Sequence, residues 1–124
     1  MGGDKVKQIL LNVLETFGYP VYLHGTLGEN EPFPPAFFTF QTITSSDISF
    51  DNQDCYAVYG YQVFFYADDP QTVESIAAQS RTALKQAGFI ADGRGVDIPS
   101  DEPTHTGWVT EYFYIKEDNN LEEP

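Results

Sequence analysis

The sequence predicts an α+β fold of two layers, in which two helices cover one face of a four- to five-stranded, mostly antiparallel sheet. Two amphipathic helical patterns and five strand-like segments give the order α-β-β-β-α-β-β. With 124 residues, the chain is long enough for one layered core and too short for two. We therefore expect a single domain over residues 4–116, followed by an acidic, flexible tail over residues 117–124.

The stretch from Tyr56 to Gly88 carries the clearest pattern. Residues 56–66 are mostly aromatic or β-branched and carry no charge, which is typical of a central strand. Asp69 and Pro70 then predict the start of a helix, because aspartate accepts from the free amides of the first turn and proline suits the first helical position. Gly88 predicts its end, since glycine readily adopts the left-handed conformation. The apolar face of this helix is narrow and consists of Val73, Ile76, Ala77, Ser80, Leu84 and Ala87.

The other elements follow from similar patterns. A first helix is expected from a cap at Asp4 to Gly18, with Val6, Ile9, Leu10, Val13, Leu14 and Phe17 on its apolar side. Strands are expected at residues 21–23, 36–43, 89–91 and 108–115. Residues 25–35, 44–54 and 92–107 are expected to connect them as loops, the last of these as a hairpin with a wide acidic tip.

The charge of the chain excludes several classes of function. Nineteen acidic and six basic residues give a net charge of −13, which repels phosphate backbones and anionic membranes. No apolar run is long enough to span a bilayer, and the N-terminus lacks the core of a signal peptide. We therefore expect a cytoplasmic protein that does not grip nucleic acid. The single cysteine, Cys55, has no partner for an internal disulfide and is interpreted as an inert thiol.

Residues for catalysis are scarce. The chain has two histidines, and His24 is interpreted as a solvated or capping residue at a strand end. No serine stands in a strand-to-helix elbow between glycines. The acidic hairpin tip could bring Asp97, Asp101, Glu102 and His105 to a divalent metal, but solvated turn residues explain the same pattern more simply. We therefore predict a protein that is not an enzyme, with no catalytic residue, no metal and no cofactor, and rank a metal-dependent hydrolase last.

The central strand presents two different faces. Tyr59, Tyr61 and Phe65 share one face and Phe64 lies on the other. Because the helix stripes are small and aliphatic, we predict that Phe64 packs under the helices and that the tyrosine-rich face stays uncovered. An uncovered aromatic face favours a subunit interface, predicted at Tyr59, Tyr61, Phe65, Trp108, Tyr112 and Tyr114. Contacts between loops and neighbouring proteins are predicted at Phe33, Arg94, Asp101 and His105.

The order of elements, with several short phrases, resembles a known group of proteins. A helix ends near Gly18-Tyr19-Pro20-Val21-Tyr22 and is followed by the strand Pro35-Ala36-Phe37-Phe38-Thr39-Phe40. A polar Asp51-Asn52 segment leads to the strand at residues 61–66 and the helix that begins at Pro70 and ends at Leu84-Lys85-Gln86-Ala87-Gly88-Phe89. Over most of residues 4–115 this resembles the small tail-terminator, tail-completion and head–tail joining proteins of long-tailed phages and prophages.

The resemblance implies a virion assembly protein without catalytic residues. Such a protein forms a ring, often of six copies, that caps the tail tube or joins it to the head. Its partners would be copies of itself and other tail or head-completion proteins, first in the cytoplasm of the bacterial host and then in the virion tail. DNA would pass nearby without specific binding, which suits an acidic surface. The alternative is a small-molecule or peptide-binding α+β domain that uses the aromatic sheet face, and the oligomeric state distinguishes the two.

Overall fold

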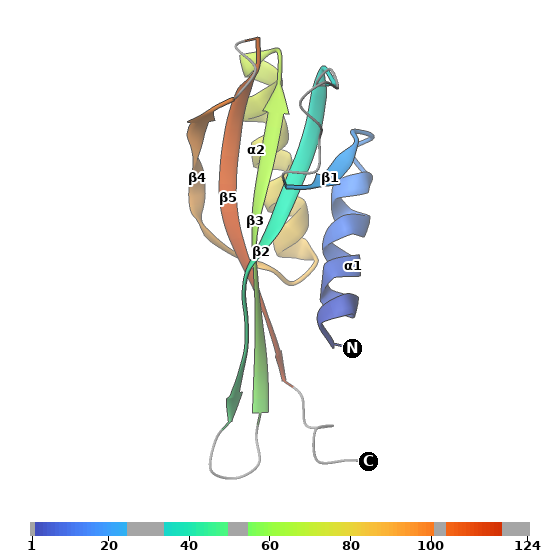
Figure 1. Cartoon of the computed structure of the whole chain (residues 1–124), viewed down its shortest axis with the longest axis vertical. Helices are drawn as coiled ribbons and strands as arrows, with labels where there is room; N and C mark the ends of the chain where they lie inside the picture. The colour runs from blue at the N-terminus through green and yellow to red at the C-terminus, as the bar shows by residue number, and fades with distance from the viewer. Residues whose placement is uncertain (1, 25–33, 50–54, 101–103, 118–124) are drawn as a thin grey trace.

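A computed structural model describes residues 2–24, 34–49, 55–100 and 104–117. It contains the helices α1 (Gly2–Glu15) and α2 (Pro70–Gln86) and the strands β1 (Val21–Leu23), β2 (Ala36–Ser49), β3 (Cys55–Ala67), β4 (Ile90–Pro99) and β5 (Thr106–Glu117). The strands form one sheet in the order β1-β2-β3-β5-β4, with β3 at its centre (Figure 1). β1 runs parallel to β2, and the other pairs are antiparallel. The predicted α+β class and element order are confirmed.

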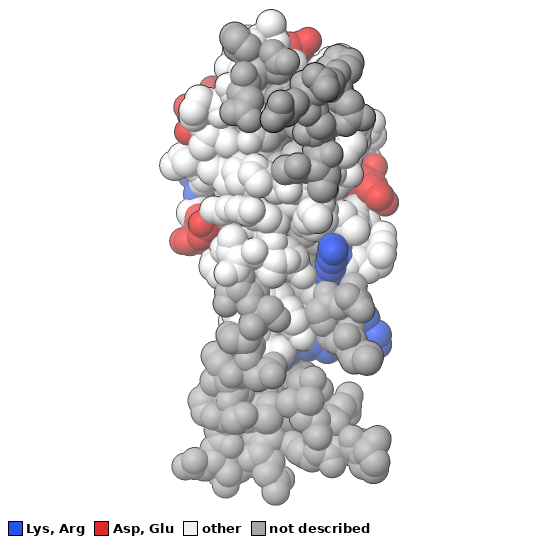
Figure 2. Space-filling view, viewed as in Figure 1, with Lys and Arg blue, Asp and Glu red and all other residues white. Residues whose placement is uncertain are grey.

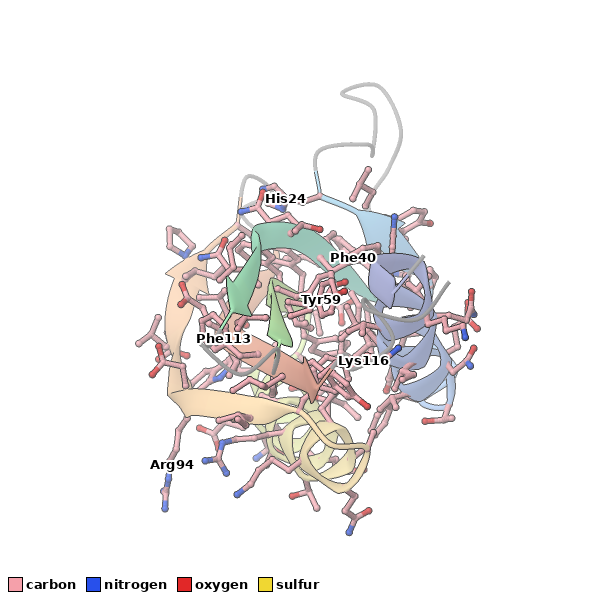
Figure 3. The ribbon with its side chains drawn as sticks, turned by 90° about the horizontal axis from the view of Figure 1, so that it is seen from below. His24, Phe40, Tyr59, Arg94, Phe113 and Lys116 are labelled. Carbon is pink, nitrogen blue, oxygen red and sulfur yellow. The ribbon has the colours of Figure 1, made fainter. Side chains whose placement is uncertain are left out.

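Both helices pack on the same side of the sheet. Seen along the strands, α1 and α2 lie side by side, and Phe40 points toward them (Figure 3). The apolar stripe of α1 buries Val6, Leu10 and Leu14 completely, as its spacing predicts. These side chains join Val73, Ile76 and Leu84 of α2 in one core with the aromatic residues of β2, β3 and β5.

The ends of α2 follow the capping chemistry that the sequence predicts. Asp69 is the N-cap, and its carboxylate accepts from the Gln71 amide at 3.3 Å and from the Thr72 hydroxyl at 2.8 Å. At the other end, Gly88 has φ +107°. The Gly88 amide donates to the Lys85 carbonyl at 3.1 Å, and the Phe89 amide donates to the Leu84 carbonyl at 3.0 Å. This pair of bonds is a Schellman motif, so the helix ends where a left-handed glycine allows it.

Three predicted boundaries are wrong. α1 begins at Gly2, so Asp4 lies in its first turn instead of at its cap. β2 continues to Ser49, beyond the predicted end at residue 43, because β3 pairs with its polar second half as far as Ser49 opposite Cys55. β4 extends from Ile90 to Pro99, where a loop was predicted from residue 92. Of the three predicted loops, residues 25–33, 50–54 and 101–103 lie outside the described part of the chain.

The assignment of the two sheet faces is also wrong. Phe65 is 2% exposed and belongs to the core beneath the helices, whereas Phe64 lies on the opposite face. The small side chains of α2, such as Ala77 and Ser80, leave volume between helix and sheet. Bulky rings fill that volume, because protein interiors are packed without voids. A stripe of small residues on the helix is therefore complementary to the aromatic face of the sheet.

Candidate functional site

The sheet face opposite the helices, here called the uncovered face, is the main candidate for interaction. No helix among the described residues lies on it. Every second side chain of each strand points to this face, and the strand registers show which ones do. It comprises Phe37, Thr39 and Gln41 of β2, Val58, Gly60, Gln62, Phe64 and Tyr66 of β3, Gly107, Val109, Glu111, Phe113 and Ile115 of β5, and Ile90, Asp92, Val96 and Ile98 of β4.

One end of the uncovered face is closed by its own aromatic rings. Phe37 is 2% exposed, and its ring stacks on Tyr66 with 5.2 Å between ring centroids. The imidazole of His24 stacks on Phe64 at 4.5 Å, and its Nδ1 lies 3.3 Å from the Thr39 hydroxyl. His24 is exposed directly after β1, as predicted for a solvated residue at a strand end, and its ring also packs over the sheet. This aromatic end offers little open surface to a ligand.

His105 contributes to the same end from the loop before β5. Its Nε2 lies 2.8 Å from the Pro34 carbonyl, which can only accept, so Nε2 carries the proton and donates. Its Nδ1 lies 2.9 Å from the Thr104 hydroxyl. Of the other members of the predicted acidic tip, Asp101 and Glu102 lie outside the described residues, and Asp97 is an exposed residue of β4. Within the described ranges, no three His, Cys, Asp or Glu side chains are grouped to hold a metal ion.

A row of polar side chains crosses the middle of the uncovered face. The Gln41 side-chain amide donates to Gln62 at 2.5 Å, and the Gln62 amide donates to the Glu111 carboxylate at 3.0 Å. Asp92 continues the row on β4, directly opposite Glu111. Two carboxylates in this position repel each other, so the row is anionic at the β4 edge. The row separates the aromatic end from the rest of the face.

Apolar side chains are exposed on both sides of this row toward the β4 edge, with Ile90 and Ile115 beyond the row and Val96 on its aromatic side, opposite Val109. Ile90, Val96 and Ile115 are 53%, 59% and 51% exposed, and we call these three residues the aliphatic patch. Phe113 and Val109 lie beside them and are half-buried. In the described part of this face, uncharged side chains occupy most of the centre and acidic ones lie toward the margins (Figure 2). Exposed apolar side chains with acidic neighbours are typical of a surface that meets another protein.

The six residues predicted for a subunit interface lie on the other side of the sheet. Tyr61, Phe65 and Tyr112 are buried in the core, and Tyr59, Trp108 and Tyr114 are partly buried against it. Tyr61, Phe65 and Tyr112, which are 1–3% exposed, therefore offer almost no surface to a neighbouring protein. Of the four predicted loop contacts, Phe33 and Asp101 lie outside the described residues, Arg94 is exposed on β4, and His105 bonds to Pro34.

Sequence reasoning missed the aliphatic patch, although a signal was present. Gln62 on β3 and Glu111 on β5 share the face that carries Phe64. From Trp108 to Tyr114, the covered face of β5 carries Trp108, Thr110, Tyr112 and Tyr114 and no charge, and Lys116 follows only near the end of the strand. A helix-covered face excludes unpaired charge, so the position of Glu111 already indicated which face stays open.

Comparison with known proteins supports the fold. No family model and no curated protein sequence matches this chain. A chain of the solved structure described as "Virion of native gene transfer agent (GTA) particle" has a similar fold, with a TM-score of 0.50 and 15% sequence identity over 90% of this chain and 91% of that one. At this identity the similarity shows the fold alone, and it extends over almost the whole of both chains. None of the described helices is long and apolar enough to cross a membrane.

Proposed function

We propose that this protein is a non-enzymatic structural component of a phage-like particle. In this proposal, copies of the chain form a ring that caps the tail tube or joins it to the head. The observation that carries the proposal is the uncovered face, where a sheet that is buried on one side exposes Ile90, Val96 and Ile115 on the other. Burial of these side chains against a second copy removes apolar surface from water, which favours association.

Two further observations support the proposal. The chain shares its fold, over 90% of its length, with a chain from a gene transfer agent virion. Its net charge of −13 would let DNA pass through a ring without adhering, because like charges repel. The partners would be other tail or head-completion proteins, and the ring would assemble in the bacterial cytoplasm before it enters the virion.

A ring places a requirement on the surface of each copy. Closed rings form through contacts in which one patch of a copy meets a different patch of the next, so each copy needs two complementary surfaces. The aliphatic patch supplies one surface of this kind. It lies toward β4, an edge strand, where a neighbour can approach without displacing either helix.

Native mass spectrometry at micromolar concentration tests the proposal. We expect one closed oligomer, with six copies as the first expectation, because heterologous contacts that close leave no free end to extend. The competing hypothesis, a small-molecule or peptide-binding domain, predicts a monomer or a dimer. A monomer at all accessible concentrations would contradict the ring. The closed aromatic end, where Phe37 and Phe64 are at most 9% exposed, gives the binding-domain hypothesis little support.

A further inference from the structure

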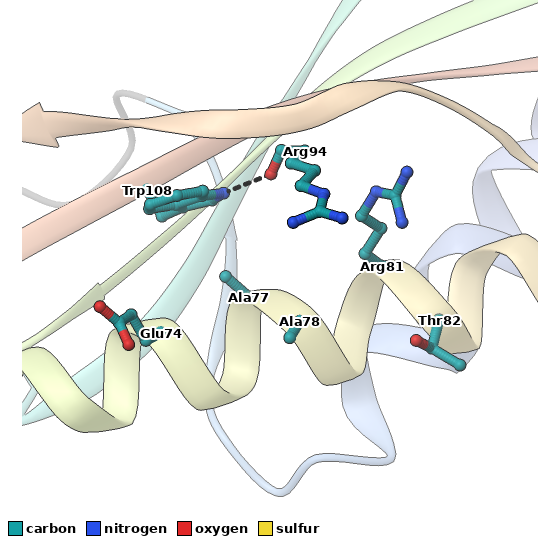
Figure 4. A pocket seen from close by; sticks show the side chains of 7 residues that line it. All are labelled: Glu74, Ala77, Ala78, Arg81, Thr82, Arg94 and Trp108. Carbon is teal, nitrogen blue, oxygen red and sulfur yellow. Dashed lines mark hydrogen bonds between the residues drawn. The ribbon is translucent and has the colours of Figure 1, made fainter.

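A second surface lies on the helix side of the molecule, between α2 and the middle of β4. It is a groove of about 320 Å³, lined by Glu74, Ala77, Ala78, Arg81, Thr82, Arg94 and Trp108 (Figure 4). The strand register explains why the groove exists. Asp92 pairs with Glu111 and Val96 with Val109, so three residues of β4, 93–95, stand opposite the single residue Thr110. This bulge carries Arg94 out of the ladder and over the exposed flank of α2.

The groove brings together two of the six basic residues of a strongly acidic chain. Arg81 projects from α2 and Arg94 from the bulge, and their guanidinium groups lie near each other at one end of the groove (Figure 4). Arg81 Nε donates to the Gly93 carbonyl at 2.9 Å, which holds that side chain in place. Within the described residues, neither guanidinium forms an ion pair. Two neighbouring cations without an anion repel each other, so an anion that reaches both is favoured.

Apart from the arginines and Glu74, the groove is lined mainly by apolar side chains and by an indole that a hydrogen bond holds in place. The Trp108 indole donates from Nε1 to the Arg94 carbonyl at 2.9 Å, so it forms a wall bonded to the bulge. Ala77 and Ala78 form the floor along α2. Glu74 lies at the end away from the arginines (Figure 4), where it would repel a second anion. A fitting ligand therefore carries carboxylates at one end and an aliphatic side chain beside them, because an arginine fork binds carboxylates well.

We propose that this groove binds the acidic C-terminal segment, residues 118–124, of a second copy of the chain. That segment contains Asp118, Glu122 and Glu123, with Leu121 directly before the glutamates. Glu122 and Glu123 match the two arginines in charge, and Leu121 matches the surface of Trp108 and the alanines in polarity. Of the two arginines, Arg81 is already held by its hydrogen bond to the Gly93 carbonyl. This lowers the conformational entropy that its side chain loses when the segment binds.

The segment of the same copy cannot place Leu121 against Trp108. Trp108 and Glu117 are nine residues apart on β5, which corresponds to roughly 30 Å along a strand. Leu121 follows Glu117 by four residues, which span at most about 14 Å. The full set of contacts, with Leu121 against Trp108 and the glutamates at the arginines, therefore requires a neighbour. This inference rests on the proposed function, since binding of the segment in the groove joins two copies through two different surfaces.

Trp108 is the only tryptophan of the chain, so its fluorescence reports on the groove directly. The receptor is the full chain with the substitutions Asp118→Asn, Glu122→Gln and Glu123→Gln. These substitutions make its own C-terminal segment neutral, so that this segment does not compete with the added peptide. The ligand is a synthetic peptide of residues 117–124. We expect a saturable fluorescence change, and a weaker one when salt is raised from about 50 to about 500 mM, because ions screen the contact.

Matched variants of this receptor locate the contact. Arg94→Gln should weaken peptide binding roughly tenfold or more, because a charge-assisted hydrogen bond is lost. Lys5→Gln changes the net charge equally, lies on α1 outside the groove, and should bind as the receptor does. A peptide with its acidic residues replaced by Asn and Gln should not bind. Thermal melts of both variants check that the fold is retained.

Three outcomes would overturn the inference. The first is no saturable change in Trp108 fluorescence at millimolar peptide. The second is an equal affinity of the Arg94→Gln variant and the receptor for the peptide. The third is a fluorescence change produced by inorganic phosphate but not by the peptide, which would indicate a small-anion site. Native mass spectrometry of the unmodified chain separates this failure from failure of the proposed function. Rings without peptide binding contradict only the groove contact, whereas peptide binding without rings supports the groove contact and contradicts the ring.

Discussion

At the scale of single residues, Tyr112 places a phenol group inside the core, where the residue is 1% exposed. Burial raises the pKa of this phenol to about 12, because the phenolate would lose its hydration. Hydrogen bonds with Thr110 and Ser80, and the charge of Arg81, lower the pKa by less. In the described part of the chain, no buried side-chain polar atom lacks a hydrogen-bond partner. The folded protein therefore keeps this proton at a pH where an unfolded tyrosine loses it.

The raised pKa of Tyr112 predicts a loss of stability in alkali. Its contribution is complete below pH 10, the ordinary pKa, and declines as the pH rises toward 12. The free energy of unfolding should fall by roughly 1 kcal/mol between about pH 9 and about pH 11 through this group alone. Urea unfolding of the protein and of Tyr112→Phe measures the difference. An equal decline in both would show that Tyr112 does not cause it.

The direction of the core rings was the residue-level property hardest to predict. Alternation along β3 correctly separates Phe64 from Phe65. Which of them meets the helices depends on the fit of side-chain volumes between elements that are distant in the sequence, and periodicity carries no information on that fit. The polar neighbour Gln62, on the same face as Phe64, was the local indication that this face is the uncovered one.

At the scale of elements, the bulge at residues 93–95 turns the middle of β4 into one side of a groove. Gly93 and Gly95 have φ angles of +75° and +91°, a region that favours glycine. Gly95 is also enclosed, because a Cβ atom there would overlap with Thr110 Oγ1, Trp108 Nε1 and the Val109 carbonyl oxygen. At Gly93 a Cβ atom would have no neighbour within 4 Å. A larger residue would therefore be under backbone strain at either position, but only at Gly95 would its side chain also collide with neighbouring atoms.

This difference predicts unequal effects of the same substitution. Gly93→Ala should cost about 1–2 kcal/mol of stability, through backbone strain alone. Gly95→Ala adds a steric clash with β5, so its cost should exceed that of Gly93→Ala by at least about 1 kcal/mol. Chemical unfolding of both variants provides the comparison. Equal costs would mean that the bulge is less closely packed on β5 than the structure shows.

The elements differ in how well the sequence predicts them. Both ends of α2 were correct, because Asp69 and Gly88 act on amides and carbonyls within a few residues of themselves. The lengths of β2 and β4 were wrong, since each depends on pairing with a strand supplied elsewhere in the chain. Thr44 to Ser49 are polar enough for a loop, yet β3 offers partners for their backbone groups. Local chemistry predicts where a helix ends, whereas strand length is a non-local property.

At the scale of the whole molecule, the fold is asymmetric. Two helices bury one face of the sheet, and the other face combines a closed aromatic end, a polar row and the aliphatic patch. The sequence predicted that one face would stay open, but the face that it assigned lies beneath the helices. The exposed residues of the uncovered face lie outside the core, so their substitution should leave the core intact. Assembly can therefore be tested separately from folding.

The most direct measurement compares Ile90→Glu with Leu23→Glu by sedimentation velocity. Ile90 is 53% exposed on the uncovered face, and Leu23 is 48% exposed on the edge strand β1, with its side chain on the helix side. A charge in an apolar contact carries a desolvation cost, so Ile90→Glu should weaken association at least about tenfold. Leu23→Glu should assemble as the unmodified protein does. Undiminished assembly of Ile90→Glu, or equal loss in both variants, would contradict association through the uncovered face.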